Sequence, residues 1–347
     1  MSTAAIAIGE LSENERELLQ RAAARADTTL SFQPSLANAI GRLRNASCLL
    51  VASGSGTGNA EIIDHVRDDV ALFTLPVIVL ADSPLQETWI RAYAQGADDI
   101  VPRRDAGGIT RRLMTVNRER GNDRPDASLG RAVIASKDDA NRRRIGRTLR
   151  NVGFDIAYAG SVKEALDEDS RPVFVVTTEQ APKGEPTLKR DVAYVNGVPV
   201  LFLGESTAFA PVQDRITDAS ARILFFADEQ AKARFKDRRS SERKLSAAMC
   251  SFREAGALEP SFGLTHNVSR EGLYVRTLDP PRAGTLLWLE LQAPGAETPV
   301  HLRATSVWTR LPGAKMGVVP PGFGLKLELD RCPAQDLAVF IGAYDKL

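Results

Sequence analysis

Short apolar runs alternate with amphipathic stretches over residues 1–118. The apolar runs have the composition of strands buried on both faces, and the stretches between them repeat apolar residues at helical spacing. Ser12, with Glu15 three residues later, predicts a capping box at the first helix. Expected strands are 3–9, 28–32, 48–52, 76–80 and 100–102, and expected helices are 12–24, 36–43, 60–66, 87–95 and 109–116. This alternation predicts a flavodoxin-like domain, with a five-stranded parallel sheet covered by helices on both faces.

The segment 131–230 repeats this plan with little sequence identity to the first copy. A polar stretch at 119–130 separates the copies and predicts a linker. Expected strands are 131–135, 154–157, 173–176, 199–203 and 222–226, with helices at 138–151 and 161–166. We therefore expect a second flavodoxin-like, five-stranded parallel α/β domain.

The pattern changes in the last segment, 231–347. Its first part, which extends to residue 244, is polar and locally basic and reads as a helix that frays into a linker arm. Beyond it, apolar residues recur with a period of two between connections rich in Pro and Gly. Expected strands are 245–252, 272–277, 285–291, 300–308 and 323–328, followed by a helix at 333–344. Such spacing predicts an antiparallel β-barrel closed by a C-terminal helix, so the fold class is multidomain α/β plus β.

Composition excludes several classes of partner. The 347 residues carry 45 basic and 44 acidic side chains, so no overall field attracts nucleic acid or anionic lipid, and an anion site must be local. The N-terminus lacks the pattern of a signal peptide, and no apolar stretch is long enough to insert into a membrane. Three widely separated cysteines suit a reducing compartment, which predicts a cytoplasmic protein.

The stretch 76–113, with the strands before it, resembles the second half of a response-regulator receiver domain, and 131–230 resembles a receiver more weakly. The resemblance implies positions for a Mg²⁺-binding acidic pair, a phosphoacceptor aspartate, a hydroxyl residue and a lysine. The acidic pair falls on Gly9 and Glu10 in the first copy and on Ser136 and Lys137 in the second, and the acceptor on Ala52 or Ser53 and on Val176 or Thr177. The hydroxyl position falls on Ala81 and Gly204, and the lysine on Arg103 and about Phe225. Neither copy retains a phosphoacceptor, so both are predicted pseudo-receivers that dock a protein partner or form a homo-oligomer.

Catalytic chemistry finds little support in the sequence. The glycine-rich loop 54–58 lacks the Lys-Ser/Thr pair of a P-loop, and we interpret it as a permissive loop. The three histidines, His65, His266 and His301, stand singly without a nucleophile or metal-ligand spacing. The sequence therefore predicts that the protein is not an enzyme and that it holds no metal.

Two short motifs precede and open the barrel. Arg239 and Arg243 form an RxxxR pattern, which Arg238 precedes, and the sequence 267–272 (NVSREG) follows. In this order and separation they resemble the signature of the PilZ family, RxxxR then [D/N]xSxxG, and the resemblance covers about residues 236–345. It implies a six-stranded antiparallel barrel that binds cyclic di-GMP through Arg238, Arg239, Arg243, Asn267, Ser269 and Gly272.

The residue types suit that ligand. An arginine pairs bidentately with phosphate or with guanine O6 and N7, and its face stacks on a base. We expect Asn267 and Ser269 on a turn, where they offer short donors and acceptors to a guanine edge or a phosphate. Gly272 permits either a close backbone approach or a positive φ. Trp288 and Trp308 read as core or barrel-surface aromatics rather than stacking platforms.

The sequence thus predicts a signalling protein in which cyclic di-GMP changes how the barrel meets the receivers or a partner. The linker arm should be mobile without ligand, because its positive charges repel one another, and ligand should tie it to the barrel. The alternative is a non-catalytic interaction adaptor whose barrel does not bind nucleotide. A phosphorylation-controlled regulator is disfavoured because no acceptor aspartate is present.

Overall fold

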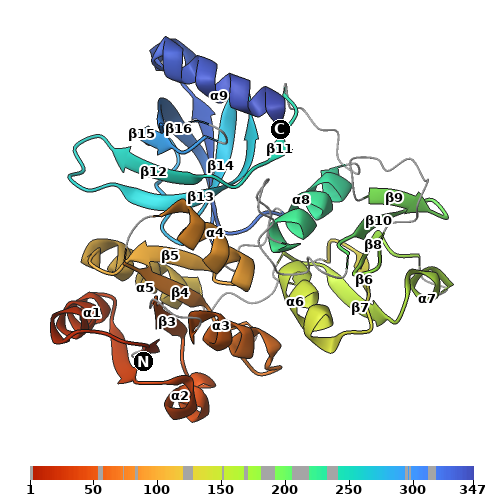
Figure 1. Ribbon diagram of the computed structural model, residues 1–347, viewed down its shortest axis with the longest axis horizontal. Helices are drawn as coiled ribbons and strands as arrows, with labels where there is room; N and C mark the ends of the chain where they lie inside the picture. The colour runs from red at the N-terminus through yellow and green to blue at the C-terminus, as the bar shows by residue number, and fades with distance from the viewer. Residues whose placement is uncertain are drawn as a thin grey trace.

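The arrangement of the chain is seen in a computed structural model (Figure 1). The structure describes all residues except 1–2, 54–57, 73, 83–84, 120–127, 151, 168–170, 181–191, 205–218, 233–240, 294–295, 297 and 312–317. Its strands form three sheets, two of five strands and one that contains a closed barrel, in the order expected from the sequence.

The first α/β domain has a parallel sheet in the order β2-β1-β3-β4-β5. Two of its three inner strands, β3 and β4, are buried along their whole length, as their continuous apolar sequences predict. Ser12 and Glu15 form the predicted capping box. The strands are β1 Thr3–Ile8, β2 Thr28–Gln33, β3 Cys48–Ala52, β4 Val77–Ala81 and β5 Asp99–Pro102, and the helices are α1 Glu13–Arg25, α2 Leu36–Leu43, α3 Gly58–Asp68, α4 Gln86–Gln95 and α5 Ala106–Glu119.

The second α/β domain has the sheet order β7-β6-β8-β10-β9. Its described strands are β6 Arg131–Ala135, β7 Asp155–Ala159, β8 Phe174–Thr177, β9 Val192–Val195 and β10 Val198–Phe202, and its helices are α6 Asp139–Arg150, α7 Val162–Asp167 and α8 Ala219–Lys232.

The last strand predicted for this domain is wrong. Residues 222–226 lie in helix α8, and the edge of the sheet is filled by β9, which pairs antiparallel with β10 across a tight hairpin. The apolar run at 222–226 is buried because α8 packs its apolar side on β8 and α6. The mapping of the receiver lysine onto Phe225 fails with that strand.

In the barrel, six strands close in the order β13-β12-β15-β16-β17-β14, and β14 pairs back onto β13. Two predictions here need correction. The stretch 245–252 is not one strand, because the chain breaks between β11 and β12, and the long strand β13 was not anticipated. The elements are β11 Lys244–Leu245, β12 Met249–Glu254, β13 Ser261–Ser269, β14 Gly272–Arg276, β15 Leu286–Leu291, β16 Val300–Arg310, β17 Gly322–Leu327, a 3-10 turn Leu329–Arg331 and α9 Ala334–Lys346.

The three folding units share hydrophobic cores. Leu264 and Ala247 of the barrel pack in one core of the first α/β domain, and Leu278 packs in the core on the other side of that sheet. Val318 packs in the core of the second α/β domain. Figure 1 shows the barrel seated on α4 and β5, with α8 beside it. The barrel is therefore built into both domains rather than tethered to them.

An ionic contact joins the two α/β domains. Arg144 of α6 lies 2.8 Å from Asp64 and 3.0 Å from Asp68 of α3. Arg147, one turn later on α6, lies 2.8 Å from Asp98. The pKa of the Asp98 carboxyl is below its ordinary value, since burial raises it but Arg147 and Arg67 lower it by more. This interface therefore pairs a basic helix with an acidic surface.

Candidate functional site

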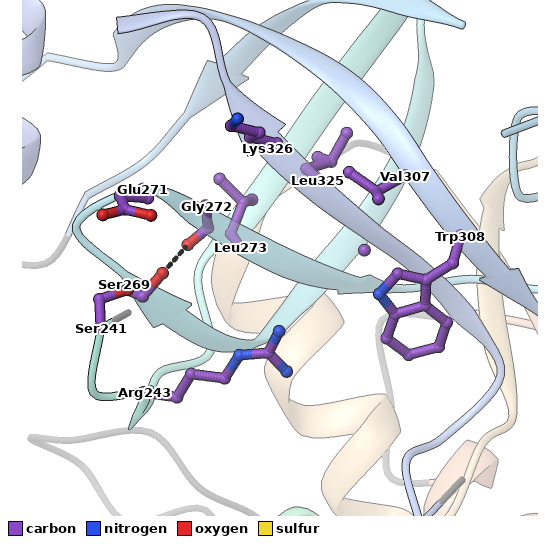
Figure 2. Close-up of a pocket in the computed structure, with 11 residues that line it drawn as sticks. Ser241, Arg243, Ser269, Glu271, Gly272, Leu273, Val307, Trp308, Leu325 and Lys326 are labelled. Atoms are coloured by element: carbon purple, nitrogen blue, oxygen red, sulfur yellow. Dashed lines mark hydrogen bonds between the residues drawn. The ribbon is translucent and has the colours of Figure 1, made fainter. Parts of the chain in front are cut away.

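A pocket of about 270 Å³ lies on the outer surface of the barrel, where β14, β16 and β17 run side by side. Residues from the linker arm, the turn between β13 and β14, and these strands surround it (Figure 2). The lining residues are Ser241, Arg243, Ser269, Glu271, Gly272, Leu273, Val307, Trp308, Gly324, Leu325 and Lys326. Three of the six residues predicted to bind ligand are thus gathered at one place.

Arg243 reaches the pocket because the short strand β11 fastens the arm to β13. Lys244 pairs with Val268, so Arg243, one residue earlier, lies beside Ser269. Figure 2 shows the Arg243 guanidinium between the turn after Ser269 and the indole of Trp308. The arm therefore brings a planar cation to the middle of the pocket.

Ser269 and Gly272 face each other across the turn that joins β13 to β14. The Ser269 hydroxyl donates to the carbonyl of Gly272 at 3.2 Å. A Cβ at Gly272 would collide with the carbonyl oxygen of Leu325 on β17. Gly272 is not among the glycines with positive φ, so of the two roles considered for it, close backbone approach is the correct one.

Asn267 lies inside β13, not on a turn as expected. It pairs with Tyr274, which places the two side chains on the same face of the sheet. The Asn267 side chain is buried, and within the described part of the chain its amide nitrogen makes no hydrogen bond. A buried donor of this kind costs about 1–3 kcal/mol. Asn267 is beside the pocket but is not one of the residues that line it.

Arg238 and Arg239 lie outside the described residues, and so does most of the glycine-rich loop 54–58. Their assignment as ligand-binding residues, and the interpretation of that loop, remain predictions from sequence.

Trp308 is a pocket residue that the sequence interpretation did not select. Its ring stacks on Tyr274, with centroids 4.9 Å apart and planes inclined by 27°. Gly324, opposite it on β17, leaves room for the indole, because a Cβ there would collide with Nε1. A tryptophan paired with a glycine on the next strand is the feature that could have indicated this residue. It can be recognised only when the register of the two strands is known.

Cations surround the aromatic pair. Burial raises the pKa of Tyr274 well above its ordinary value, while Arg310, Arg276 and Arg243 act in the opposite direction. Lys326 adds a positive charge at the rim, and Glu271 a negative one. The site thus offers a flat aromatic surface, a guanidinium and a hydroxyl-bearing turn, which suit a planar base joined to a phosphate.

In the first α/β domain, an arginine that follows the last strand contacts two acidic side chains. Arg103 follows β5 and lies 3.0 Å from Asp82 and 3.5 Å from Glu15. It also donates to the backbone carbonyl of Glu10 at 3.2 Å. Strand β3 ends at Ala52, so its last residue carries no carboxylate. Arg103 thus places a positive charge beside these two carboxylates at the carboxyl end of the sheet.

Among the described residues, no group of three His, Cys, Asp or Glu side chains is arranged to hold a metal ion. None of the helices described has both the length and the apolar character needed to cross a bilayer.

No protein-family model matches the chain, and no curated protein matches it. Among solved structures, the Bacillus subtilis inhibitor of motility is 18% identical over 32% of this chain and 51% of its own, with a TM-score of 0.26, so the chain spans about half its length. The PilZ domain of CeSA from a cellulose-synthesizing bacterium is 16% identical over 29% of this chain and 92% of its own, with a TM-score of 0.23. The CheY-like protein TadZ from Pseudomonas aeruginosa is 20% identical over 33% of this chain and 94% of its own, with a TM-score of 0.28.

The architecture itself agrees with the fold class expected from the sequence. Two five-stranded α/β sheets are followed by a closed six-stranded antiparallel barrel and a C-terminal helix. The chain therefore consists of two receiver-like domains and a PilZ-like barrel.

Proposed function

We propose that this protein is a cyclic di-GMP receptor that uses the barrel pocket as its ligand site. The observation that carries the proposal is the convergence of Arg243, the Ser269–Gly272 turn and Trp308 on one surface. These groups come from separate parts of the chain. The pairing of the barrel strands does not by itself place an arginine beside the Trp308 ring.

Each group has a part in this assignment. Arg243 pairs bidentately with a phosphate or with the O6 and N7 edge of a guanine. Trp308 offers a stacking surface to a base, a contact worth about 1–3 kcal/mol. The unpaired amide of Asn267 provides a donor near the same face. At about 270 Å³, the pocket is slightly smaller than the usual ~300–1,000 Å³, so it suits one half of a dinucleotide.

The same proposal makes the protein a sensor rather than an enzyme. Binding at the barrel would be read out by the receiver-like domains, which share cores with the barrel and would dock a protein partner or a second copy. An occupied pocket would then bias the geometry of the whole chain.

One observation favours the rival, an adaptor that binds no nucleotide. Ser269 and Gly272 both have roles within the barrel, as a turn hydrogen bond and as a close strand contact. These two residues would be needed even without a ligand, and Trp308 also packs over Gly324 and Tyr274. Arg243 lines the pocket from the linker arm, outside the six strands that close the barrel, so its replacement discriminates best between the two functions.

The test is a calorimetric titration of the full chain with cyclic di-GMP. We expect saturable binding, weakened about ten- to a hundredfold in Arg243→Ala, since one arginine–guanine pair is worth ~1–3 kcal/mol. Arg253→Ala is the matched control, because that exposed arginine lies on β12, away from the pocket. Absence of heat in the wild type would favour the adaptor, whereas equal affinities in the two variants would show that the ligand does not bind at Arg243.

A further inference from the structure

The residues on both sides of Arg243 are held by one residue of the C-terminal helix, Tyr344. The hydroxyl of Tyr344, on α9, donates to the backbone carbonyl of Glu242 at 3.1 Å. The ammonium of Lys244 donates to the backbone carbonyl of Tyr344 at 3.0 Å and lies 4.5 Å from the centre of its ring. Figure 1 shows the C-terminus beside β11. The arm is therefore fastened to α9 immediately before and after the pocket arginine.

The other wall of the pocket is fastened to the same turn of helix. Arg270, in the turn between Ser269 and Gly272, lies 2.8 Å from Asp345. Its guanidinium carbon is 5.9 Å from the centre of the Tyr344 ring. The last turn of α9 thus contacts the linker arm and the β13–β14 turn together.

Strand geometry explains what this fastening does. Successive side chains of an extended chain point to opposite sides. Because Lys244 turns toward α9, Arg243 is directed the other way, into the pocket. Tyr344 is itself almost fully buried, so its ring has little freedom to move away.

We propose that Tyr344 is a positioning residue, which holds the arm so that Arg243 is aimed into the pocket before ligand arrives. The proposal rests on the function proposed above. Holding a flexible side chain and its backbone in the bound conformation lowers the entropy lost on binding, and so strengthens affinity without a direct contact.

The binding test uses the full chain and cyclic di-GMP. Tyr344→Phe keeps the ring but removes the hydroxyl, and we expect about fivefold weaker binding, the equivalent of one hydrogen bond. In an Arg243→Ala background the same change should have no further effect, because Tyr344 acts through that arginine. Tyr194→Phe, an exposed tyrosine on β9, is the matched control and should bind as wild type. Equal losses with and without Arg243 would overturn the proposal.

A ligand-free measurement separates this inference from the proposed function. Amide hydrogen exchange of Lys244 and Leu245 should be several-fold faster in Tyr344→Phe, while exchange in β15 stays unchanged. If the wild type binds no cyclic di-GMP, the proposed function fails and exchange alone decides whether Tyr344 holds the arm. Unchanged exchange in β11 would overturn the role of Tyr344 whatever the ligand result.

Discussion

The guanidinium of Arg276, at the end of β14 in the barrel, lies 4.3 Å from the centre of the Tyr93 ring on α4 of the first receiver-like domain. Strand β14 begins at Gly272, in the pocket, and ends at this contact. Tyr93 in turn donates its hydroxyl to Asp99 at 2.8 Å. One strand therefore connects the candidate ligand site with the buried polar centre of the interdomain contact.

Asp99 is the first place to test that contact. Its carboxylate accepts from Arg112 Nε at 2.8 Å and from the backbone N–H of Leu278 at 2.6 Å, and both it and Arg112 are buried. Asp99→Asn removes the nearer carboxylate from the buried Arg112 and leaves it Asp279, whose Oδ2 is 3.5 Å from Nη1, so we expect a loss of up to about 3–5 kcal/mol in the free energy of unfolding.

The control uses the exposed half of the same interface. Arg111 pairs with Asp279 at 2.8 Å but is half exposed, so Arg111→Ala should cost less than about 1 kcal/mol. Urea unfolding of both variants provides the measurement, and similar losses would show that the Asp99 network carries no special stability.

Gly272 should be needed for the fold as well as for any ligand. In Gly272→Ala the new methyl group collides with Leu325 O, so β14 and β17 must separate, at a cost of about 1–3 kcal/mol by thermal unfolding. Gly342→Ala, where nothing lies near the added methyl group, should be neutral or stabilising by up to ~1 kcal/mol, since alanine is the better helix former. Equal stability of Gly272→Ala and wild type would refute the close-contact assignment.

Ligand should protect the linker arm from proteolysis. The arm is already fastened at Glu242 and Lys244, so a nucleotide held by Arg243 should protect the part before them, and trypsin should cleave within 236–240 more slowly at saturating cyclic di-GMP. The rate is followed by mass spectrometry, with Arg243→Ala as the control that should show no protection. Identical wild-type rates with and without ligand would mean that the arm does not respond.

Phosphoryl transfer to the receiver-like domains should not occur. Strand β3 ends at Ala52 and β8 at Thr177, so neither acceptor position carries an aspartate. Incubation with acetyl phosphate and Mg²⁺ should leave the intact mass of the protein unchanged. A stable adduct mapped to residues 1–230 would show that the assigned strand ends are not the acceptor positions.

Stability should fall at alkaline pH in part through Tyr274. Its pKa is raised by burial, so between the ordinary value of 10.0 and the higher folded value the native state keeps a proton that the unfolded chain releases. The contribution of Tyr274 to the free energy of unfolding is complete below pH 10. It is lost as the pH rises above 10, by up to about 1.4 kcal/mol per pH unit. Tyr274→Phe should flatten this decline in urea unfolding at pH 9–11, whereas the exposed Tyr194→Phe should not.

Periodicity predicted most of the fold because most strands here are bounded by turn residues and buried in a regular way. It failed at 222–226, since a short apolar run fits a buried helix as well as a buried strand. It also missed β13, where polar residues such as Thr265 and Asn267 are buried against the rest of the chain. Burial of that kind depends on contacts made far away in sequence.

Some residues of the candidate site could likewise be predicted from the sequence, and others could not. Arg243, Ser269 and Gly272 were identified by motif spacing, and the structure brings them to one pocket. Trp308 could not be selected, because its place depends on the register of β16 with β17. Tyr344 is a hundred residues from the arm it contacts, so no local pattern indicates it.

The sharing of cores between the barrel and the receiver-like domains has a consequence for synthesis on the ribosome. The first domain emerges long before Leu264 and Leu278, which complete its two cores, and the second domain emerges before Val318. At about 5–20 residues per second, the nascent chain would wait on the order of ten seconds with these apolar surfaces uncovered. We expect chaperones to bind such a nascent chain. Truncation before the barrel should leave two aggregation-prone domains rather than two independently stable ones.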